Sequence, residues 1–233
     1  MLRLTRHQAR ALDRVAHETH GLAGCVLMEN AGLLAALEIE RLYHALAPHP
    51  SGPVIVFCGG GNNGGDGFVI ARQLQARDVP VILECTHGVR EGRGDARVNH
   101  RCAQTLGIPI HQIDLAGDSA AHRDRWPDAA LFVDALLGTG FQGPMRAPLA
   151  RLIMAMNAAR AECGTLTVAI DLPSGLDCDA GHPADPTVVA DQTLTFAAEK
   201  AGFSSREAQP FLGRVTVLPI GVSATRVLGD DPS

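Results

Sequence analysis

The sequence lacks the signals of secretion, membrane insertion and disulfide bonding. No apolar segment of the kind found in a signal peptide follows Met1–His7, and no window approaches the length of a membrane span. The six cysteines show no CxxC pair and no compact spacing, and several lie in apolar runs where cysteine behaves as a small hydrophobic residue. We therefore expect a soluble protein in a reducing, cytoplasmic compartment, without a membrane partner.

Lysine is almost absent, because Lys200 is the only one and nearly all positive charge is arginine. The formal net charge is −5, which argues against a nucleic-acid partner. A nucleotide-like ligand can still be held by backbone amides. We expect Lys200 to be exposed near the carboxyl end, where it is only a weak candidate for a phosphate contact.

The composition is that of an ordinary globular protein, with 46% hydrophobic and 19% charged residues. No internal repeat or low-complexity linker interrupts the 233 residues. We therefore expect one domain over residues 1–233.

β-branched apolar runs alternate with helix-length segments along most of the chain. Strands are expected at Val54–Cys58, Val79–Glu84, Ile108–Ile113, Leu131–Leu136, Leu166–Ile170, Gln192–Ala197 and Arg214–Leu218. Helices are expected at Gly65–Arg77, Gly92–Leu106 and Leu149–Ala161. Two more precede the first strand: one begins at its N-cap residue Thr5, and the other covers about Gly24–Ala47. This pattern predicts an α/β fold: a Rossmann-like three-layer sandwich with a mainly parallel sheet and two extra N-terminal helices.

Three polar segments follow expected strands: Gly59–Gly67, Asp134–Pro144 and Asp171–Asp177. Because ligands of such sheets bind at the carboxyl ends of the strands, these segments are the candidate site. The first, between a strand and a helix, has the form of an anion cradle, with bare backbone N–H groups and a helix dipole facing one point.

The glycine-rich segment supports more than one interpretation. Gly59, Gly61 and Gly64 match the GxGxxG pattern, and Glu84 lies where a Rossmann acid binds a ribose hydroxyl, so an NAD-dependent dehydrogenase is one alternative. However, we recognise no catalytic His or Lys/Tyr arrangement beyond it. The dehydrogenase pattern also leaves Asn62, Asn63 and Asp66 unexplained.

Asn62 and Asn63 can act as turn formers, and the carboxylate of Asp66 can complement the helix dipole. They can equally supply oxygen atoms to a hard cation, or a polar pocket to a ligand amide and hydroxyls. Carboxamides and a carboxylate among six glycines favour the second interpretation. No His/Cys cluster suggests zinc.

The segment GGGNNGGDG at residues 59–67 resembles the signature loop of the NAD(P)H-hydrate epimerase family, the YjeF N-terminal domain. DALLGTGFQGP at residues 134–144 and AIDLPSGLD at residues 169–177 match the family in order and spacing. Residues 28–32, 193–196 and 200–203 are similar as well. The resemblance therefore runs from about residue 5 to about residue 222.

The resemblance implies an isomerase that interconverts the R and S epimers of NADHX and NADPHX, hydrated forms of the nicotinamide cofactors. NADHX and NADPHX are then substrates, and no redox cofactor is expected. The residues implied to bind substrate are Asn62, Asn63, Gly64, Gly65, Asp66, Gly138, Thr139, Gly140, Phe141, Gln142, Gly143, Pro144 and Asp171. The residues implied to bind one potassium ion (K+) per subunit are Asn63, Asp134 and Ser174.

Epimerisation breaks and remakes a bond at C6, a hemiaminal carbon. Either water leaves to give an iminium-like ring, or the ring opens to an aldehyde and closes on the other face. Both routes need a proton carried by a positioned carboxylate. We expect Asp171 to be this catalytic residue, because it ends a strand and matches a ligand contact of the family; Asp66 is the alternative.

The sequence departs from the family at one notable position. Many relatives carry a lysine after the second strand, where this chain has His87, which would hold a phosphate less fully at neutral pH or is only a solvated loop residue. Lys200 precedes Ala201, where relatives often have proline.

The resemblance also implies partners: a homodimer, and an NAD(P)HX dehydratase that acts on the product. Bacterial relatives often continue into a dehydratase domain, for which this sequence has no room, so we expect a stand-alone epimerase or one half of a longer protein. A non-enzymatic alternative is a dimerising scaffold, as in messenger-RNA decapping factors, whose pocket motifs are altered.

Overall fold

The computed structural model describes residues 2–46, 52–86, 94–115, 126 and 128–229. His87, which the sequence analysis singled out, lies outside the described residues. The helix expected from Gly92 is described from Gly94 onward.

Within the described residues, the main sheet has seven strands, and all of their pairings are parallel. In chain order they are β2 (Val54–Cys58), β3 (Val81–Cys85), β4 (Ile110–Gln112), β5 (Leu131–Ala135), β6 (Leu166–Ile170), β7 (Gln192–Phe196) and β9 (Arg214–Leu218). In space they follow the order β4-β3-β2-β5-β6-β7-β9. The winding therefore reverses between β2 and β5, which is the topological switch point of such a sheet.

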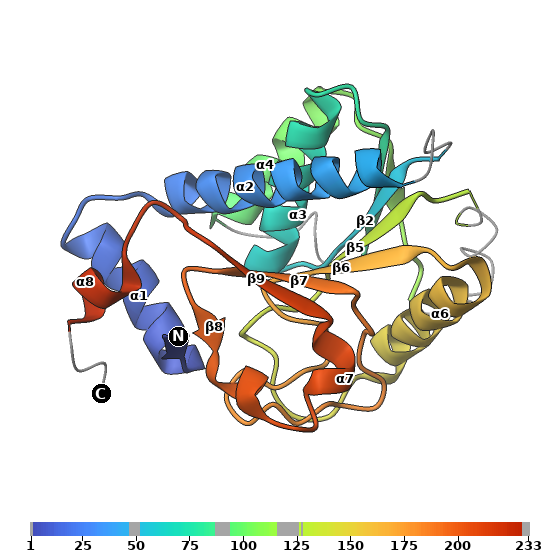
Figure 1. Cartoon of the computed structure of the whole chain (residues 1–233). Helices are drawn as coiled ribbons and strands as arrows, with labels where there is room; N and C mark the ends of the chain where they lie inside the picture. Colours follow the sequence, from blue (N-terminus) through green and yellow to red (C-terminus); the bar gives the residue numbers. More distant parts are fainter. Residues whose placement is uncertain (1, 47–51, 87–93, 116–125, 127, 230–233) are drawn as a thin grey trace.

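Helices cover both faces of the sheet and complete the expected three layers (Figure 1). One face carries α2 (Gly24–Ala45), α3 (Asn62–Gln75) and α4 (Gly94–Thr105), and the other carries α6 (Ala147–Cys163). Two apolar clusters fill the spaces between the layers, one with Phe68 and Ile70 of α3, the other with Leu152 and Met156 of α6. The central strands read as continuous apolar runs because both of their faces are buried.

Helix α3 begins at Asn62, three residues before the expected start at Gly65. Glycine is a poor helix former, so the sequence suggested a longer turn here. Close packing explains the glycines instead. A Cβ built on Gly64 would lie 2.8 Å from the carbonyl carbon of Gly59, and one on Gly32 of α2 would lie 2.5 Å from the Cβ of Val69.

The N-terminal segment takes part in a short ladder, a separate two-stranded sheet, that the sequence did not predict. Strand β1 (Arg3–Leu4) pairs in parallel with β8 (Glu199–Lys200), so that Leu4 lies opposite Lys200. Helix α1 (Arg6–Glu18) follows with the expected Thr5 cap, and it packs on α8 (Ala224–Leu228), so that the first and the last labelled helices lie together in Figure 1. Two short helices, η1 (Ala201–Ser204) and α7 (Gln209–Leu212), link β8 to β9.

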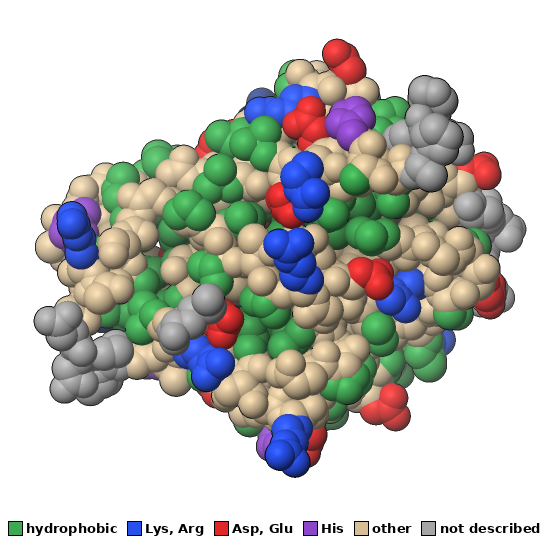
Figure 2. Space-filling model, in the orientation of Figure 1, with side chains coloured by type: hydrophobic (Ala, Val, Ile, Leu, Met, Phe, Trp, Pro, Cys, Tyr) green, Lys and Arg blue, Asp and Glu red, His purple; other side chains and the backbone are tan. Residues whose placement is uncertain are grey.

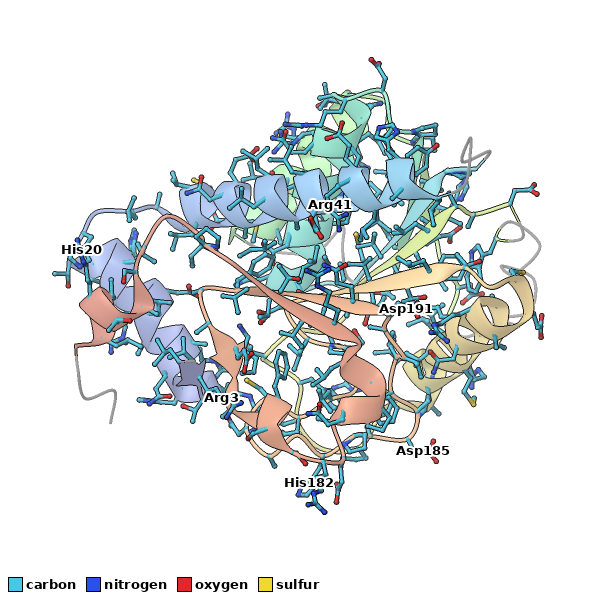
Figure 3. All side chains as sticks on the ribbon, viewed as in Figure 1. Arg3, His20, Arg41, His182, Asp185 and Asp191 are labelled. Atoms are coloured by element: carbon cyan, nitrogen blue, oxygen red, sulfur yellow. The ribbon has the colours of Figure 1, made fainter. Side chains whose placement is uncertain are left out.

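Acidic and basic side chains are interspersed on the face shown in Figure 2 and do not form a patch of one sign. Arginines pair with nearby carboxylates: Arg41 binds Glu38 at 2.7 Å, and Arg160 pairs with Asp191. Arg41 and Asp191 are labelled in Figure 3. Among the described residues, no helix has the length and apolar character needed to cross a membrane.

Candidate functional site

A cavity of about 640 Å³ lies at the carboxyl end of the sheet, beside the switch point. The segments that follow β2, β5, β6 and β7 form its floor, and α1 and the start of α2 form its outer wall. Its polar lining residues are Arg10, Asp13, Asn62, Asn63, Asp66, Asp95, Thr139, Asp171 and Lys200. The three segments that the sequence analysis selected therefore meet in one place.

The turn after β2 presents backbone to this cavity. Gly61 is the N-cap of α3 and has no side-chain cap, so the first N–H groups of the helix are available to an anion. A Cβ on Gly61 would meet nothing within 4 Å. By contrast, Gly64 and Gly65 are buried and do not line the cavity; a Cβ on Gly65 would lie 2.7 Å from the Cε of Met28.

Asp171 and Lys200 form a shielded ion pair at the floor, with Nζ 2.6 Å from Oδ1. The expectation that Lys200 is exposed is wrong: it is only 2% exposed, and it also donates to the carbonyl of Phe196 at 3.1 Å. The β1–β8 ladder holds it there. Asp171 has φ 67°, a left-handed conformation that is unusual outside glycine and turns this residue sharply at the end of β6.

Two further carboxylates share this cavity and interact electrostatically with the pair. Desolvation raises the pKa of Asp66 well above its usual range; the charges of Asp171 and Asp13 raise it further, and Lys200 opposes the shift. Asp13 remains open to solvent on the cavity side, yet the surrounding protein and Asp171 raise its pKa to about 6. Sequence reasoning missed Asp13, because nothing local indicates that the α1 helix reaches the sheet edge.

Asn63, Asp134 and Ser174 come together below the Asp134–Pro144 segment. The Ser174 hydroxyl donates to Oδ1 of Asp134 at 2.6 Å, and its backbone N–H donates to Oδ2 at 2.7 Å. Asn63 joins them through Leu137, whose carbonyl accepts from Nδ2 at 3.0 Å and whose N–H donates to the Ser174 hydroxyl at 2.9 Å. Burial raises the pKa of Asp134 to about 6, although these hydrogen bonds oppose the shift.

The oxygen atoms of this cluster fit a hard cation. Asn63 is 7% exposed, and its Oδ1 has no hydrogen-bond partner among the described residues, which is costly for a buried carbonyl. A cation bound by Oδ1 would remove that cost. Carboxylate, amide and hydroxyl oxygens are ligands that such ions prefer.

Arg6 of α1 fixes the segment after β5, and sequence reasoning also missed it. Its buried guanidinium donates to the carbonyls of Thr139 and Phe141 and pairs with Asp177 at 3.0 Å and Asp179 at 3.1 Å. An arginine next to the Thr5 cap is the only local signal. The result is that α1 orders one wall of the cavity.

The remaining candidate residues differ in their placement. Gly138, Thr139, Gly140 and Phe141 line the cavity, whereas Gln142, Gly143 and Pro144 are exposed and lie outside its wall. Glu84, the ribose acid of the dehydrogenase alternative, is fully buried, and its Oε1 lies 3.1 Å from Nδ1 of His111. It is therefore not placed to bind a ribose hydroxyl.

A parallel sheet whose winding reverses at a glycine turn, with a polar cavity at the reversal, defines a Rossmann-like α/β protein of the ligand-binding type. More specifically, residues 24–202 match the family described as YjeF-related protein N-terminus. The chain belongs to this family, as the sequence motifs predicted.

The relatives agree with this assignment. The chain is 40% identical to the NAD(P)H-hydrate epimerase of Rhodopirellula baltica over 94% of this chain and 84% of that protein, and 39% identical to the one of Pirellula staleyi over 93% and 91%. It is 38% identical to the bifunctional NAD(P)H-hydrate repair enzyme Nnr of Moorella thermoacetica, of which it covers 41%. The yeast protein ynu0 has the same fold, with a TM-score of 0.77 at 21% identity over 93% of this chain and 87% of that one.

Proposed function

We propose that this protein is an NAD(P)H-hydrate epimerase that interconverts the R and S forms of NADHX and NADPHX. The observation that carries the proposal is the group of Asp13, Asp66 and Asp171 around the buried Lys200, within a cavity at the switch point. These groups supply both proton donors and proton acceptors in one place. The names of the 40% and 39% identical relatives support the same activity.

The carboxylates suit the two roles that epimerisation requires. Asp66, whose pKa is raised, carries a proton that it can donate to the C6 hydroxyl as the C6–O bond breaks and the lone pair of N1 forms the C6=N1 bond. Water then adds to the other face of C6 and returns a proton to the carboxylate. In the alternative route, a carboxylate takes up the hydroxyl proton, C6 becomes an aldehyde as the C6–N1 bond breaks, and N1 is protonated. The ring then closes on the other face of C6, with the same proton transfers in reverse. Both routes are redox-neutral and need only proton transfer.

Asp171 is placed to stabilise cationic character on the ring or to accept a proton, because it is held by Lys200 at the floor of the cavity. Asp13, across the cavity on α1, offers a second exchangeable proton near neutral pH. The assignment of Asp171 as the catalytic residue thus becomes a shared role among three carboxyl groups.

We further propose that Asn63, Asp134 and Ser174 hold a potassium ion. The ion supplies a fixed positive charge beside the segment at residues 138–141 and compensates the buried carboxylate of Asp134. The support is the unsatisfied Oδ1 of Asn63 within a set of oxygen ligands.

Partners and location follow from the same proposal. A separate NAD(P)HX dehydratase would consume the product, as the bifunctional relative from Moorella thermoacetica suggests. The homodimer stays a prediction. Cytoplasmic location is supported by the six cysteines, all free in the structure.

The experiment is incubation with racemic NADPHX, with the R and S forms resolved by chromatography, in the presence and absence of potassium. We expect equilibration of the two forms without absorbance change at 340 nm, faster with potassium. A dehydrogenase would need an oxidisable second substrate, and a scaffold would do nothing.

Asp171→Asn tests the site. It should abolish epimerisation while NADPHX binding is largely kept. Asp185→Asn is the matched control, because Asp185 is exposed (Figure 3) and does not line the cavity. Wild-type turnover in Asp171→Asn would refute the catalytic role of Asp171.

A further inference from the structure

A second cavity, of about 420 Å³, lies on the other side of the wall that bounds the first. Gly60, Leu136 and Leu137 line both cavities. These residues follow β2 and β5, the two strands that flank the switch point. A single extended ligand that lies across the sheet edge can therefore reach both cavities.

The second cavity is lined mainly by apolar side chains and has one cationic side chain, Arg146, and one acidic side chain, Asp114. Leu115 follows β4, and Pro148 and Leu149 belong to the first turn of α6, where Arg146 is the N-cap residue. Its volume is in the range of small-molecule sites, about 300–1,000 Å³. This lining fits a flat, mostly apolar ring with an anionic group at its edge.

The two cavities differ in their balance of charged side chains. The first is lined by four carboxyl groups and two cations, so a phosphate placed there would meet an excess of acidic groups; these residues are Asp13, Asp66, Asp95 and Asp171, and Arg10 and Lys200. The uncapped N-terminus of α3 starts at Gly61, which is open to the first cavity and follows the shared Gly60. Arg146 lies in the second cavity. The phosphates of a dinucleotide are thus expected between the α3 N-terminus and Arg146, at the boundary of the two cavities and away from the carboxyl groups of the first.

We propose that the second cavity binds the adenosine half of the dinucleotide substrate, with Arg146 contacting a phosphate of that half. The hydrated ring then occupies the first cavity. This inference rests on the proposed function, because it assigns the two ends of the same substrate. It agrees with the general rule that a dinucleotide crosses the switch point of a doubly wound sheet.

The test compares intact NADHX and NADPHX with a truncated substrate, the hydrate of reduced nicotinamide mononucleotide, which lacks the adenosine half. Leu149→Trp fills the second cavity, and Arg146→Gln removes its cation. Arg101→Gln is the charge-matched control, because Arg101 is an exposed residue of α4 that lines neither cavity. Thermal unfolding of each variant checks that it is folded.

We expect each of the two cavity variants to raise KM for the intact substrate roughly tenfold with little change in kcat, as for loss of one charge-assisted contact. Their kinetics with the truncated substrate should match those of the wild type, and Arg101→Gln should match it throughout. Adenosine 5′-monophosphate should inhibit the wild type competitively and Leu149→Trp roughly tenfold more weakly.

The outcomes separate the two proposals. If the wild type epimerises neither substrate, the proposed function fails. If the wild type is active but KM for the intact substrate is unchanged in folded Leu149→Trp and Arg146→Gln, the adenosine site is refuted. Equal losses with intact and truncated substrates would also refute it, since the effect would then come from the first cavity.

Discussion

The two glycines Gly61 and Gly64 lie in the same short segment but should respond in opposite ways to alanine. Gly64 is inside α3, where replacing glycine by alanine ordinarily stabilises a helix by about 0.5–1 kcal/mol. Its Cβ, however, would lie 2.8 Å from the carbonyl carbon of Gly59 and closer still to the oxygen. Carbon atoms pack at about 3.5–4.0 Å, so the backbone would have to move by roughly 1 Å.

Such overpacking costs about 1–3 kcal/mol, and more where the contact is backbone on both sides. We take about 3 kcal/mol for the clash and subtract about 1 kcal/mol for helix propensity, which leaves a net loss of about 2 kcal/mol in the free energy of unfolding. For a chain of this size, that corresponds to a fall in Tm of about 4–8 °C.

Gly61→Ala is the matched control for stability, because its Cβ would meet nothing within 4 Å and its φ of −102° suits any residue. Alanine is a poorer N-cap than glycine, so the expected loss is under about 1 kcal/mol. The new methyl would nevertheless project where substrate approaches the α3 N-terminus, and KM should rise about tenfold.

Urea unfolding followed by circular dichroism gives both stabilities, and epimerisation kinetics give KM. A Gly64→Ala protein as stable as the wild type would refute the packing argument. A Gly61→Ala protein with wild-type KM would refute the position assigned to the substrate.

Three further perturbations test the charges of the site. Asp66→Asn should raise Tm by an amount that grows from pH 4 to pH 8. Because the pKa of Asp66 is raised in the folded state, the folded wild type is most stable at low pH and loses stability as the pH rises through the folded-state pKa. Melting curves at three pH values check this, and a constant difference in Tm contradicts it. Lys200→Met should cost about 3–5 kcal/mol in urea unfolding, because it leaves Asp171 without its buried partner, and a loss below about 1 kcal/mol would show that the pair is effectively solvated. Arg6→Lys should speed proteolysis of the segment at residues 138–144 and raise KM, because one ammonium group cannot replace the several contacts of the Arg6 guanidinium. Arg3→Lys is the control, because the Arg3 side chain is 48% exposed, and it should change neither quantity. Equal behaviour of the two variants would contradict the role of Arg6 in anchoring this segment.

The central strands were the most predictable part of the fold. Val54–Cys58 and Leu166–Ile170 have the bounds expected from the sequence, and so does the edge strand Arg214–Leu218. Strands inside a parallel sheet must be apolar on both faces, which leaves a continuous β-branched run that sequence reasoning can find.

The start of α3 was less predictable, because two demands compete at the same residues. Local propensity places Gly64 and Gly65 in a turn, whereas the approach of neighbouring backbone and of Met28 requires residues without a Cβ in a helix. Tertiary packing determines the outcome, and packing cannot be deduced from a local window.

Lys200 shows the same limit for the site. A single lysine near the carboxyl end has no periodic pattern around it, and the strand that holds it, Glu199–Lys200, is only two residues long. Its burial depends on Leu4, which is nearly two hundred positions away in the chain. Short ladders of this kind leave no signal in hydrophobic periodicity.

The same ladder has a consequence for how the activity depends on the N-terminal segment. The family match covers residues 24–202, yet Asp13 and Arg6 precede it and contribute a carboxyl group and the anchor of one cavity wall. Both residues belong to α1, which is held by the β1–β8 ladder and by Asp177 and Asp179. The Rossmann-like part alone therefore supplies the glycine turn, Asp66, Asp171 and the oxygen cluster, but the outer wall that closes the cavity over them comes from a segment that docks from outside the sheet. Proton exchange at C6 and ordering of residues 138–141 are thus coupled through one helix, and a change that loosens α1 should impair both together.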